Sequence, residues 1–139
     1  MGETVQLTEH ILAVRVGEGD PRAMLGEFRR TAVLVPRNEA GVLAGMSGGI
    51  QWIYAFTDEE RLARFAAARG APPDAEVPYH VLLGARLLDV VVPEAGVPTG
   101  VALDVADAER AMLFPPVTGI VPDQAADRET ADEMLREGP

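Results

Sequence analysis

Residues Ile50–Gly70 have the sequence IQWIYAFTDEERLARFAAARG, which predicts a strand that passes directly into a helix. In its first half, Trp52, Tyr54 and Phe56 recur at every second position and place three aromatic rings on one face. The alternate positions are mostly small or apolar, as in a strand that is covered on at least one side. We therefore expect an interior strand around which the remaining elements pack.

The second half of this stretch carries the signals of a helix. Thr57 is expected to be the N-cap, and Glu60 three residues later completes a capping box. Leu62 and Phe65 fall on one helical stripe and should face the sheet. Gly70, which is soon followed by two prolines, is a C-terminal stop signal. Residues 50–70 therefore predict a helix packed on a strand, and they contain no catalytic motif.

Helices are also predicted at the N-terminus. Residues 8–16 fit either a helix or a strand, and we favour the helix. A second helix should begin at Pro21, with Asp20 as its N-cap. Further strands are expected at residues 31–36 (ended by Pro36), 42–44, 77–83, 101–104 and 111–114, with a turn at 45–49, a short helix at 84–91 and a turn-rich connector from Pro93.

These elements predict an α+β fold. Because the connections are short, we expect a mixed, mostly antiparallel sheet of about five strands, with helices mainly on one face. A length of 139 residues suits a single domain over residues 1–122. Residues 123–139 should form an acidic C-terminal helix or tail.

Composition excludes several classes of protein. No apolar run approaches the roughly 20 residues of a membrane span, and the N-terminus has no signal-peptide pattern, so we expect a cytoplasmic protein. The absence of cysteine rules out disulfides, thiolate nucleophiles and thiolate metal sites. All 12 basic residues are arginine, which excludes a P-loop lysine or a Schiff-base lysine.

The net charge of −10 is concentrated toward the C-terminus. Residues 87–139 contain 11 acidic residues and 3 arginines, a net charge of −8. This balance opposes nucleic-acid binding through phosphates. The acidic residues 123–139 could meet a protein partner with a basic surface, and a solvated tail that serves solubility explains them equally well.

Five segments resemble the N-terminal domain of the SseB (enhanced serine sensitivity) family. They are Arg30-Thr-Ala-Val-Leu-Val-Pro36, Ala55-Phe-Thr-Asp-Glu-Glu60, Gly84-Ala-Arg-Leu-Leu88, Gly100-Val-Ala-Leu-Asp104 and Leu113-Phe-Pro115. The resemblance covers residues 20–122 and implies a small α+β domain of the bacterial cytoplasm, without catalytic residues to transfer. Longer relatives add a second domain that this chain lacks. The arginine-only, alanine-rich composition is similar to that of actinobacterial proteins.

The segment Gly45-Met-Ser47-Gly-Gly49 matches the G-x-S-x-G pattern of a nucleophile elbow. Asp58 or Asp74, followed by His80, would complete a triad in the usual chain order. A glycine-rich hairpin turn explains the same residues, and we favour it because the aromatic strand follows. The element after Ser47 separates the two hypotheses, since a helix favours a hydrolase and a strand favours a binding module.

The remaining candidates have structural explanations that we prefer. His10 and His80 lack the spacing of zinc ligands, and His80 should be a half-buried strand residue. The carboxylates at 58–60 suit the positive end of a helix better than acid–base catalysis. Asp104, Asp107 and Glu109 lie in a predicted turn without the spacing of a calcium loop.

Trp52 and Tyr54 could stack a base or a sugar, but on a central strand they should be core residues. The sequence thus predicts a non-enzymatic protein-interaction or regulatory domain, with no catalytic, cofactor-binding or metal-binding residue assigned. The alternatives are a small serine hydrolase that uses Ser47 and a small-ligand sensor with a pocket at Trp52 and Tyr54.

Overall fold

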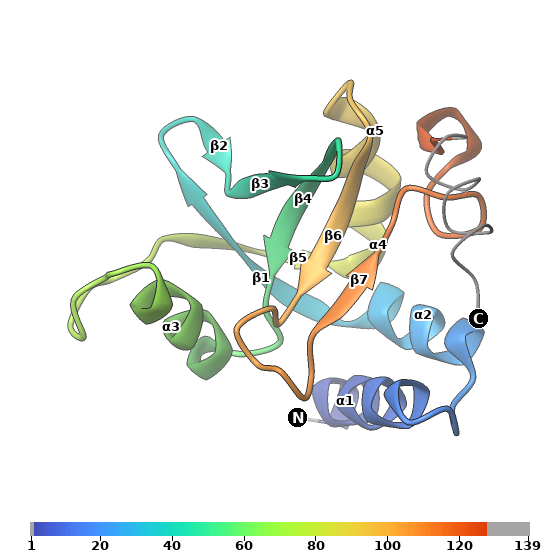
Figure 1. The fold of residues 1–139 in the computed structure, drawn as a ribbon, viewed down its shortest axis with the longest axis horizontal. Helices are drawn as coiled ribbons and strands as arrows, with labels where there is room; N and C mark the ends of the chain where they lie inside the picture. Colours follow the sequence, from blue (N-terminus) through green and yellow to red (C-terminus); the bar gives the residue numbers. More distant parts are fainter. Residues whose placement is uncertain (1, 128–139) are drawn as a thin grey trace.

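The computed structural model describes residues 2–127, and its elements confirm the α+β prediction (Figure 1). The helical elements are α1 (Gly2–Arg15), α2 (Pro21–Arg30), α3 (Glu59–Ala68), α4 (Gly84–Arg86), the π-helical turn η1 (Leu87–Val91), α5 (Val92–Glu94) and the 3-10 turn η2 (Asp123–Ala125). The strands are β1 (Ala32–Asn38), β2 (Gly41–Val42), β3 (Ala44–Ser47), β4 (Ile50–Ala55), β5 (Tyr79–Leu83), β6 (Thr99–Leu103) and β7 (Met112–Phe114).

The seven strands of the described chain form two sheets in place of the single sheet of about five. One has the order β2-β1-β5 and is antiparallel throughout. The other has the order β3-β4-β6-β7, in which only the β4–β6 pair is parallel. Reciprocal backbone hydrogen bonds of 2.8 and 2.9 Å between Leu34 and Phe56 join the two sheets. The prediction of mixed, mostly antiparallel pairing is confirmed.

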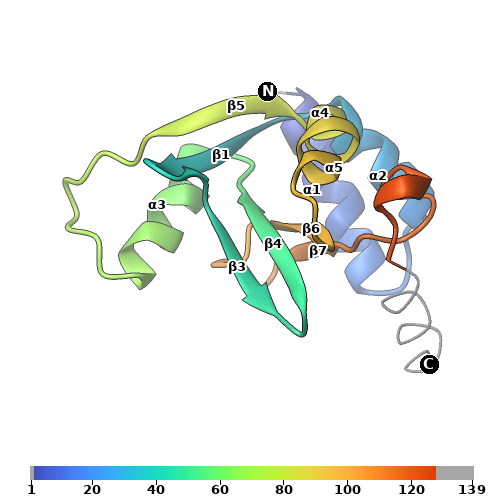
Figure 2. The same cartoon turned by 90° about the horizontal axis from the view of Figure 1, so that it is seen from above.

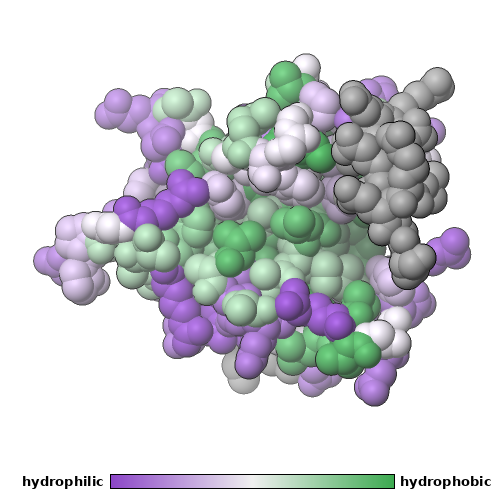
Figure 3. Space-filling view, viewed as in Figure 1, coloured by the Kyte–Doolittle hydropathy of each residue, from purple (hydrophilic) through white to green (hydrophobic). Residues whose placement is uncertain are grey.

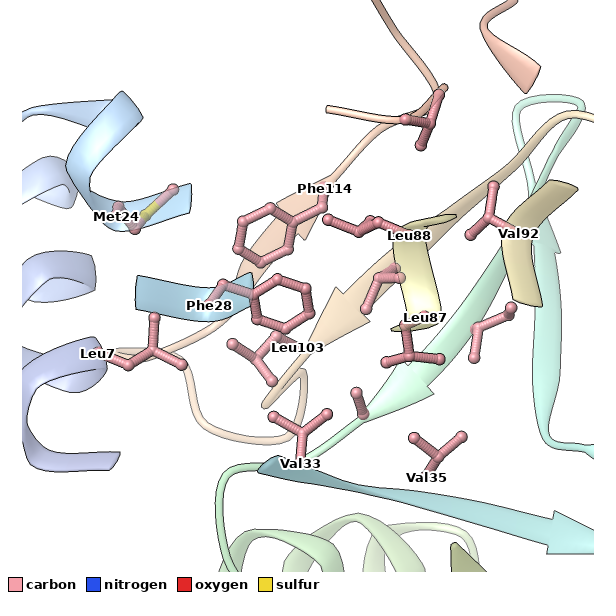
Figure 4. Close-up of a cluster of buried hydrophobic side chains, with 14 of the residues drawn as sticks. Leu7, Met24, Phe28, Val33, Val35, Leu87, Leu88, Val92, Leu103 and Phe114 are labelled. Carbon is pink, nitrogen blue, oxygen red and sulfur yellow. The ribbon is translucent and has the colours of Figure 1, made fainter. Parts of the chain in front are cut away.

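The main core lies between one face of the four-stranded sheet, strand β1 and the helices α1, α2, α4–η1 and α5 (Figures 1 and 4). Phe28 of α2 stacks on Phe114 of β7 with the ring centroids 4.2 Å apart. Ile53 and Ala55 are the β4 residues that enter this core. The smaller side of β4 therefore faces the larger core, and each side chain there removes apolar surface from water.

The aromatic side of β4 meets a second, smaller cluster beneath α3. Phe56, Leu62 and Phe65 are buried there, and Tyr54 packs beside them. The Phe65 ring lies 4.7 Å from that of Tyr54 and 5.0 Å from that of Phe56. The predicted contact face of α3 is confirmed, and Gly70 ends the helix with a φ of +92°.

Local hydrogen bonding explains where the predicted boundaries differ. The N-terminal segment is the helix α1, as favoured. Strand β1 does not end at Pro36, because the missing N–H would point away from β5 and the Pro36 carbonyl accepts from Leu43 N–H at 2.8 Å. The helix after β5 continues past Pro93 through the π-helical turn, in which Val92 N–H donates to the Leu87 carbonyl.

The C-terminal part of the described chain packs against the core. Val121 is buried in the main cluster, and Ala125 and Ala126 lie against it. Asp127 N–H donates to the Pro116 carbonyl at 2.8 Å. The rest of the predicted acidic helix or tail, residues 128–139, lies outside the described residues. Among residues 2–127, no helix is both long enough and apolar enough to cross a membrane.

Candidate functional site

Ser47 lies at the end of a hairpin strand and not on a nucleophile elbow. It pairs with Ile50 across a two-residue turn, Gly48-Gly49, in which both residues have positive φ (+61° and +81°). These angles belong to the hairpin turn whose twist matches the flanking strands, and glycine adopts them without strain. Strand β4 follows directly, so no helix N-terminus stands behind Ser47 to help stabilise an oxyanion.

The other residues of the hypothetical triad belong to different parts of the fold. His80 is exposed on β5, in the other sheet, which corrects the prediction of a half-buried residue. Asp58 caps α3, and Asp74 lies in the exposed loop after it. No hydrogen bond joins Ser47 to any of these residues within the described chain.

The opposite end of β4 holds the most buried carboxylate of residues 6–127. Asp104, which directly follows β6, is 1 % exposed and is the only buried acidic residue in residues 6–127. Its Oδ1 accepts from Thr57 N–H at 2.9 Å, and its Oδ2 accepts from the Thr57 hydroxyl at 2.8 Å. Because β4 and β6 are parallel, their carboxyl ends meet at this edge and bring together residues 47 positions apart.

This contact corrects the predicted capping box. The Thr57 hydroxyl is used by Asp104, and the N-cap is Asp58, whose Oδ1 accepts from Arg61 N–H at 2.9 Å. The acidic first turn of α3 still matches the positive end of the helix dipole, as expected.

The environment of Asp104 changes its ionisation. Burial raises the pKa of its carboxyl group above the ordinary value, although both hydrogen bonds from Thr57 act in the opposite direction. Asp104 also has a φ of +51°, which aspartate tolerates better than most residues. The sequence predictions place Asp104 both at the end of a strand over 101–104 and in the acidic turn that follows. The available signal was its position directly after the apolar residues Val101, Ala102 and Leu103.

An ion-pair network surrounds this point and ties the 104–110 turn to α3. Arg61 Nε lies 3.3 Å from Asp107 Oδ2, and Arg61 Nη1 lies 3.7 Å from Asp58 Oδ1. On the other side, Arg110 Nη1 lies 3.8 Å from Asp58 Oδ2. Burial raises the pKa of Asp107, but the backbone N–H of Glu109 and the charge of Arg61 outweigh this effect, so that the net pKa is lowered.

The network is suited to structural stabilisation and not to catalysis. Both oxygens of Asp104 are already used by Thr57, and the side chain is closed to solvent. A general acid or base needs to reach a substrate proton at hydrogen-bond distance. Within the described residues, no group of three or more acidic or histidine side chains is arranged to hold a metal ion.

Trp52 and Tyr54 lie half-buried on the outer face of the four-stranded sheet, which corrects the prediction that they are core residues. Trp52 lies against Gly100, where a Cβ atom would come within 2.7 Å of the indole ring, and Tyr54 lies against Gly45 in the same way. Arg69 Nη2 donates to the Tyr54 hydroxyl at 2.8 Å. The two rings thus cover neighbouring strands, and Figure 3 shows further apolar surface in the middle of this face.

A groove of about 710 Å³ runs between α3 and the 72–79 segment. Neither Trp52 nor Tyr54 lines it, so it does not correspond to the predicted sensor pocket. Its apolar lining includes Leu62, Ala63 and Val77. Groove volumes of roughly 300–1,000 Å³ are usual for ligand sites.

Acidic side chains surround this apolar lining. Glu59, Glu60 and Glu76 contribute to the groove together with Arg64, and Glu60 is ion-paired with both Arg61 and Arg64. The Tyr79 hydroxyl donates to Glu59 Oε1 at 3.1 Å, and this hydrogen bond raises the pKa of the phenol. The groove therefore combines apolar contact area with a negative rim.

Comparisons of the chain with protein-family models, with curated proteins and with solved structures returned no match. The SseB resemblance remains a prediction from the segments quoted above, and the site has to be interpreted from its own geometry.

Proposed function

We propose that this chain is a non-enzymatic protein-interaction or regulatory domain that binds a segment of a partner protein in the groove beside α3. The observation that carries the proposal is the apolar lining of this groove within an acidic rim. The segment that fits it presents an apolar side chain flanked by arginine or lysine. We expect the domain to act in the cytoplasm, and this expectation comes from the sequence alone.

The shape of the groove favours a peptide segment over a small molecule. A small-molecule site usually encloses most of its ligand, whereas this groove is open to solvent along α3. A partner segment can place apolar side chains against Leu62 and Val77 while its backbone remains outside. Glu59, Glu60 and Glu76 then favour positive charge, in a part of the sequence separate from the acidic residues 123–139, from which the sequence suggested a basic partner.

The two alternative functions, a serine hydrolase and a small-ligand sensor, have less support from the geometry. A serine hydrolase requires a strand–turn–helix at the nucleophile, whereas Ser47 is followed by a turn and a strand. A sensor that uses Trp52 and Tyr54 requires a cavity at these rings, and the groove lies on another side of α3.

Selection from a phage-displayed library of random dodecapeptides tests the proposal. We expect the enriched peptides to combine an apolar residue with arginine or lysine and to bind more weakly as salt rises. Ala63→Arg places a bulky cation in the groove at an exposed helix position and should weaken binding by roughly tenfold or more.

Ala68→Arg is the matched control, because Ala68 is exposed on the same helix but does not line the groove. It should leave peptide binding unchanged. Enrichment of peptides without basic residues, or equal binding by wild type and Ala63→Arg, would contradict the proposal.

A further inference from the structure

We infer that β5 is a self-association edge, through which two copies of this chain pair their β2-β1-β5 sheets into one continuous antiparallel sheet. The inference does not rest on the proposed function, because it is argued from the open backbone edge of β5, although Glu76 and Tyr79 also line the groove.

Strand β5 is the longest open edge of the described sheets. It has five residues, whereas the other edge strands β2, β3 and β7 have two, four and three. Its outer side lies along the margin of the molecule (Figure 2). Edge strands are commonly protected by charged residues, internal proline or bulges, but β5 has the sequence YHVLL.

The hydrogen-bond register shows which backbone groups face outward. Gly84 N–H donates to the Thr31 carbonyl, and Arg37 N–H donates to the Pro78 carbonyl, both at 3.0 Å. Even-numbered residues of this segment therefore direct their backbone groups toward β1. Tyr79, Val81 and Leu83 direct theirs toward the open edge.

The same odd-numbered residues present apolar side chains on one face of the strand. Val81 is 60 % exposed and Leu83 is 50 % exposed, although both belong to a sheet. An added antiparallel strand would satisfy the outward backbone groups and cover these side chains together.

A second copy of β5 fits this edge in a self-complementary register centred on Val81. The two Val81 residues then face each other, and Tyr79 of each copy faces Leu83 of the other. All three pairs are of the hydrogen-bonded type, because all of these residues direct their backbone groups outward. A two-fold axis at Val81 is the closed symmetry expected of a homodimer.

Charges at the ends of β5 support this orientation. Glu76 and Arg86 are both exposed and lie five residues before and after Val81. The two-fold arrangement brings Glu76 of one copy to the end of the strand pair that carries Arg86 of the second copy. This complementarity favours a second copy of the chain as the partner, paired antiparallel in the register centred on Val81, over a parallel or shifted pairing.

Sedimentation equilibrium of the full chain over micromolar to millimolar concentrations tests the inference. The wild type should form a concentration-dependent dimer. Val81→Arg and Val81→Glu should each weaken it by roughly tenfold or more, because like charges then face each other at the axis. An equimolar mixture of the two variants should restore dimers, because opposite charges meet at the same point.

Leu113→Arg is the matched control, since Leu113 is 52 % exposed on another edge strand, β7. It should leave the dimer intact, and circular dichroism should show all variants folded. A wild type that stays monomeric at millimolar concentration overturns the inference and leaves the edge to a strand of another protein. A dimer that is insensitive to Val81, or a mixture that fails to pair, also overturns it.

Discussion

The two ends of strand β4 differ in what their sequences suggest and in what their structures contain. The Ser47–Ile50 end matches a catalytic motif, yet it is an exposed turn of two glycines. The Thr57 end carries no catalytic motif, yet it joins a helix cap, a buried carboxylate and an ion-pair network. The short motif was explained by local backbone geometry, whereas the buried site depends on contacts between distant segments.

Energetically, the two ends should differ just as clearly. At the turn, the backbone is satisfied by the hairpin itself, and the side chains of Met46 and Ser47 are exposed. At the other end, α3 is held by buried aromatic rings and by hydrogen bonds to the turn after β6. Substitutions at the Thr57 end should therefore reduce stability, and those at the turn should be nearly neutral.

The largest effect is expected for Phe65→Ala beneath α3. Phe65 is 7 % exposed and contacts the rings of both Tyr54 and Phe56. Its truncation should lower the free energy of unfolding by about 3–5 kcal/mol in a denaturant titration. Met46→Ala, at a residue 67 % exposed near the turn, is the comparison and should change it by less than about 0.5 kcal/mol. Similar losses for both variants would contradict the difference between the two ends.

The next largest effect is expected for Asp104→Ala. This change leaves the buried Thr57 N–H without an acceptor and places alanine at a φ of +51°. We expect a loss of about 2–4 kcal/mol in the free energy of unfolding. Asp104→Asn keeps an acceptor and an amino acid that tolerates this φ, so it should be close to neutral at pH 7. Equal losses for the two variants would show that the hydrogen bonds do not stabilise this end.

A smaller difference in the free energy of unfolding is expected between alanine substitutions at Thr57 and at Asp58. Thr57→Ala removes a hydroxyl donor to a buried carboxylate, and we expect a loss of about 1.5–3 kcal/mol. Asp58→Ala removes the N-cap of α3 and should cost about 1 kcal/mol. Both are measured by denaturant unfolding at pH 7. The reverse order would support the predicted Thr57 cap in place of the one in the structure.

The stability difference between wild type and Asp104→Asn should depend on pH, and this dependence tests the raised pKa of Asp104. Burial raises the folded-state pKa of Asp104, so the folded state binds this proton more readily than the unfolded state. The resulting stabilisation is complete below the ordinary aspartate pKa and is lost as pH rises through the raised pKa. Wild type should therefore lose stability relative to Asp104→Asn over this range. Parallel unfolding curves of the two proteins across acidic pH would contradict the raised pKa.

Local patterns were sufficient for much of the fold. Alternation predicted β4, and the spacing of Leu62 and Phe65 predicted the buried face of α3. The turn predicted at 45–49 is limited to Gly48 and Gly49, because residues 45–47 belong to β3. In each case the signal and the structure lie within a few residues of each other.

The buried site could not be predicted in this way. Asp104 and Thr57 are 47 residues apart, and they meet only because β6 aligns in parallel with β4. Either residue by itself resembles a common turn or cap residue. The groove beside α3 likewise needs the path of the 72–79 segment, which periodicity does not specify.

The smallest effect is expected for Ser47→Ala, at the end of β4 that carries the motif. Ser47 is exposed and precedes a turn whose conformation depends on Gly48 and Gly49, so the free energy of unfolding should change by less than about 0.5 kcal/mol. A fluorophosphonate probe should label wild type no more than Ser47→Ala, because within residues 2–127 no base is hydrogen-bonded to the hydroxyl and a strand, not a helix, follows it. Heat-denatured wild type supplies the background. Labelling of the folded wild type above this background, lost in Ser47→Ala, would show that the hairpin activates its serine after all. Absence of specific labelling would leave β4 with a conformational motif at one end and a buried polar site at the other.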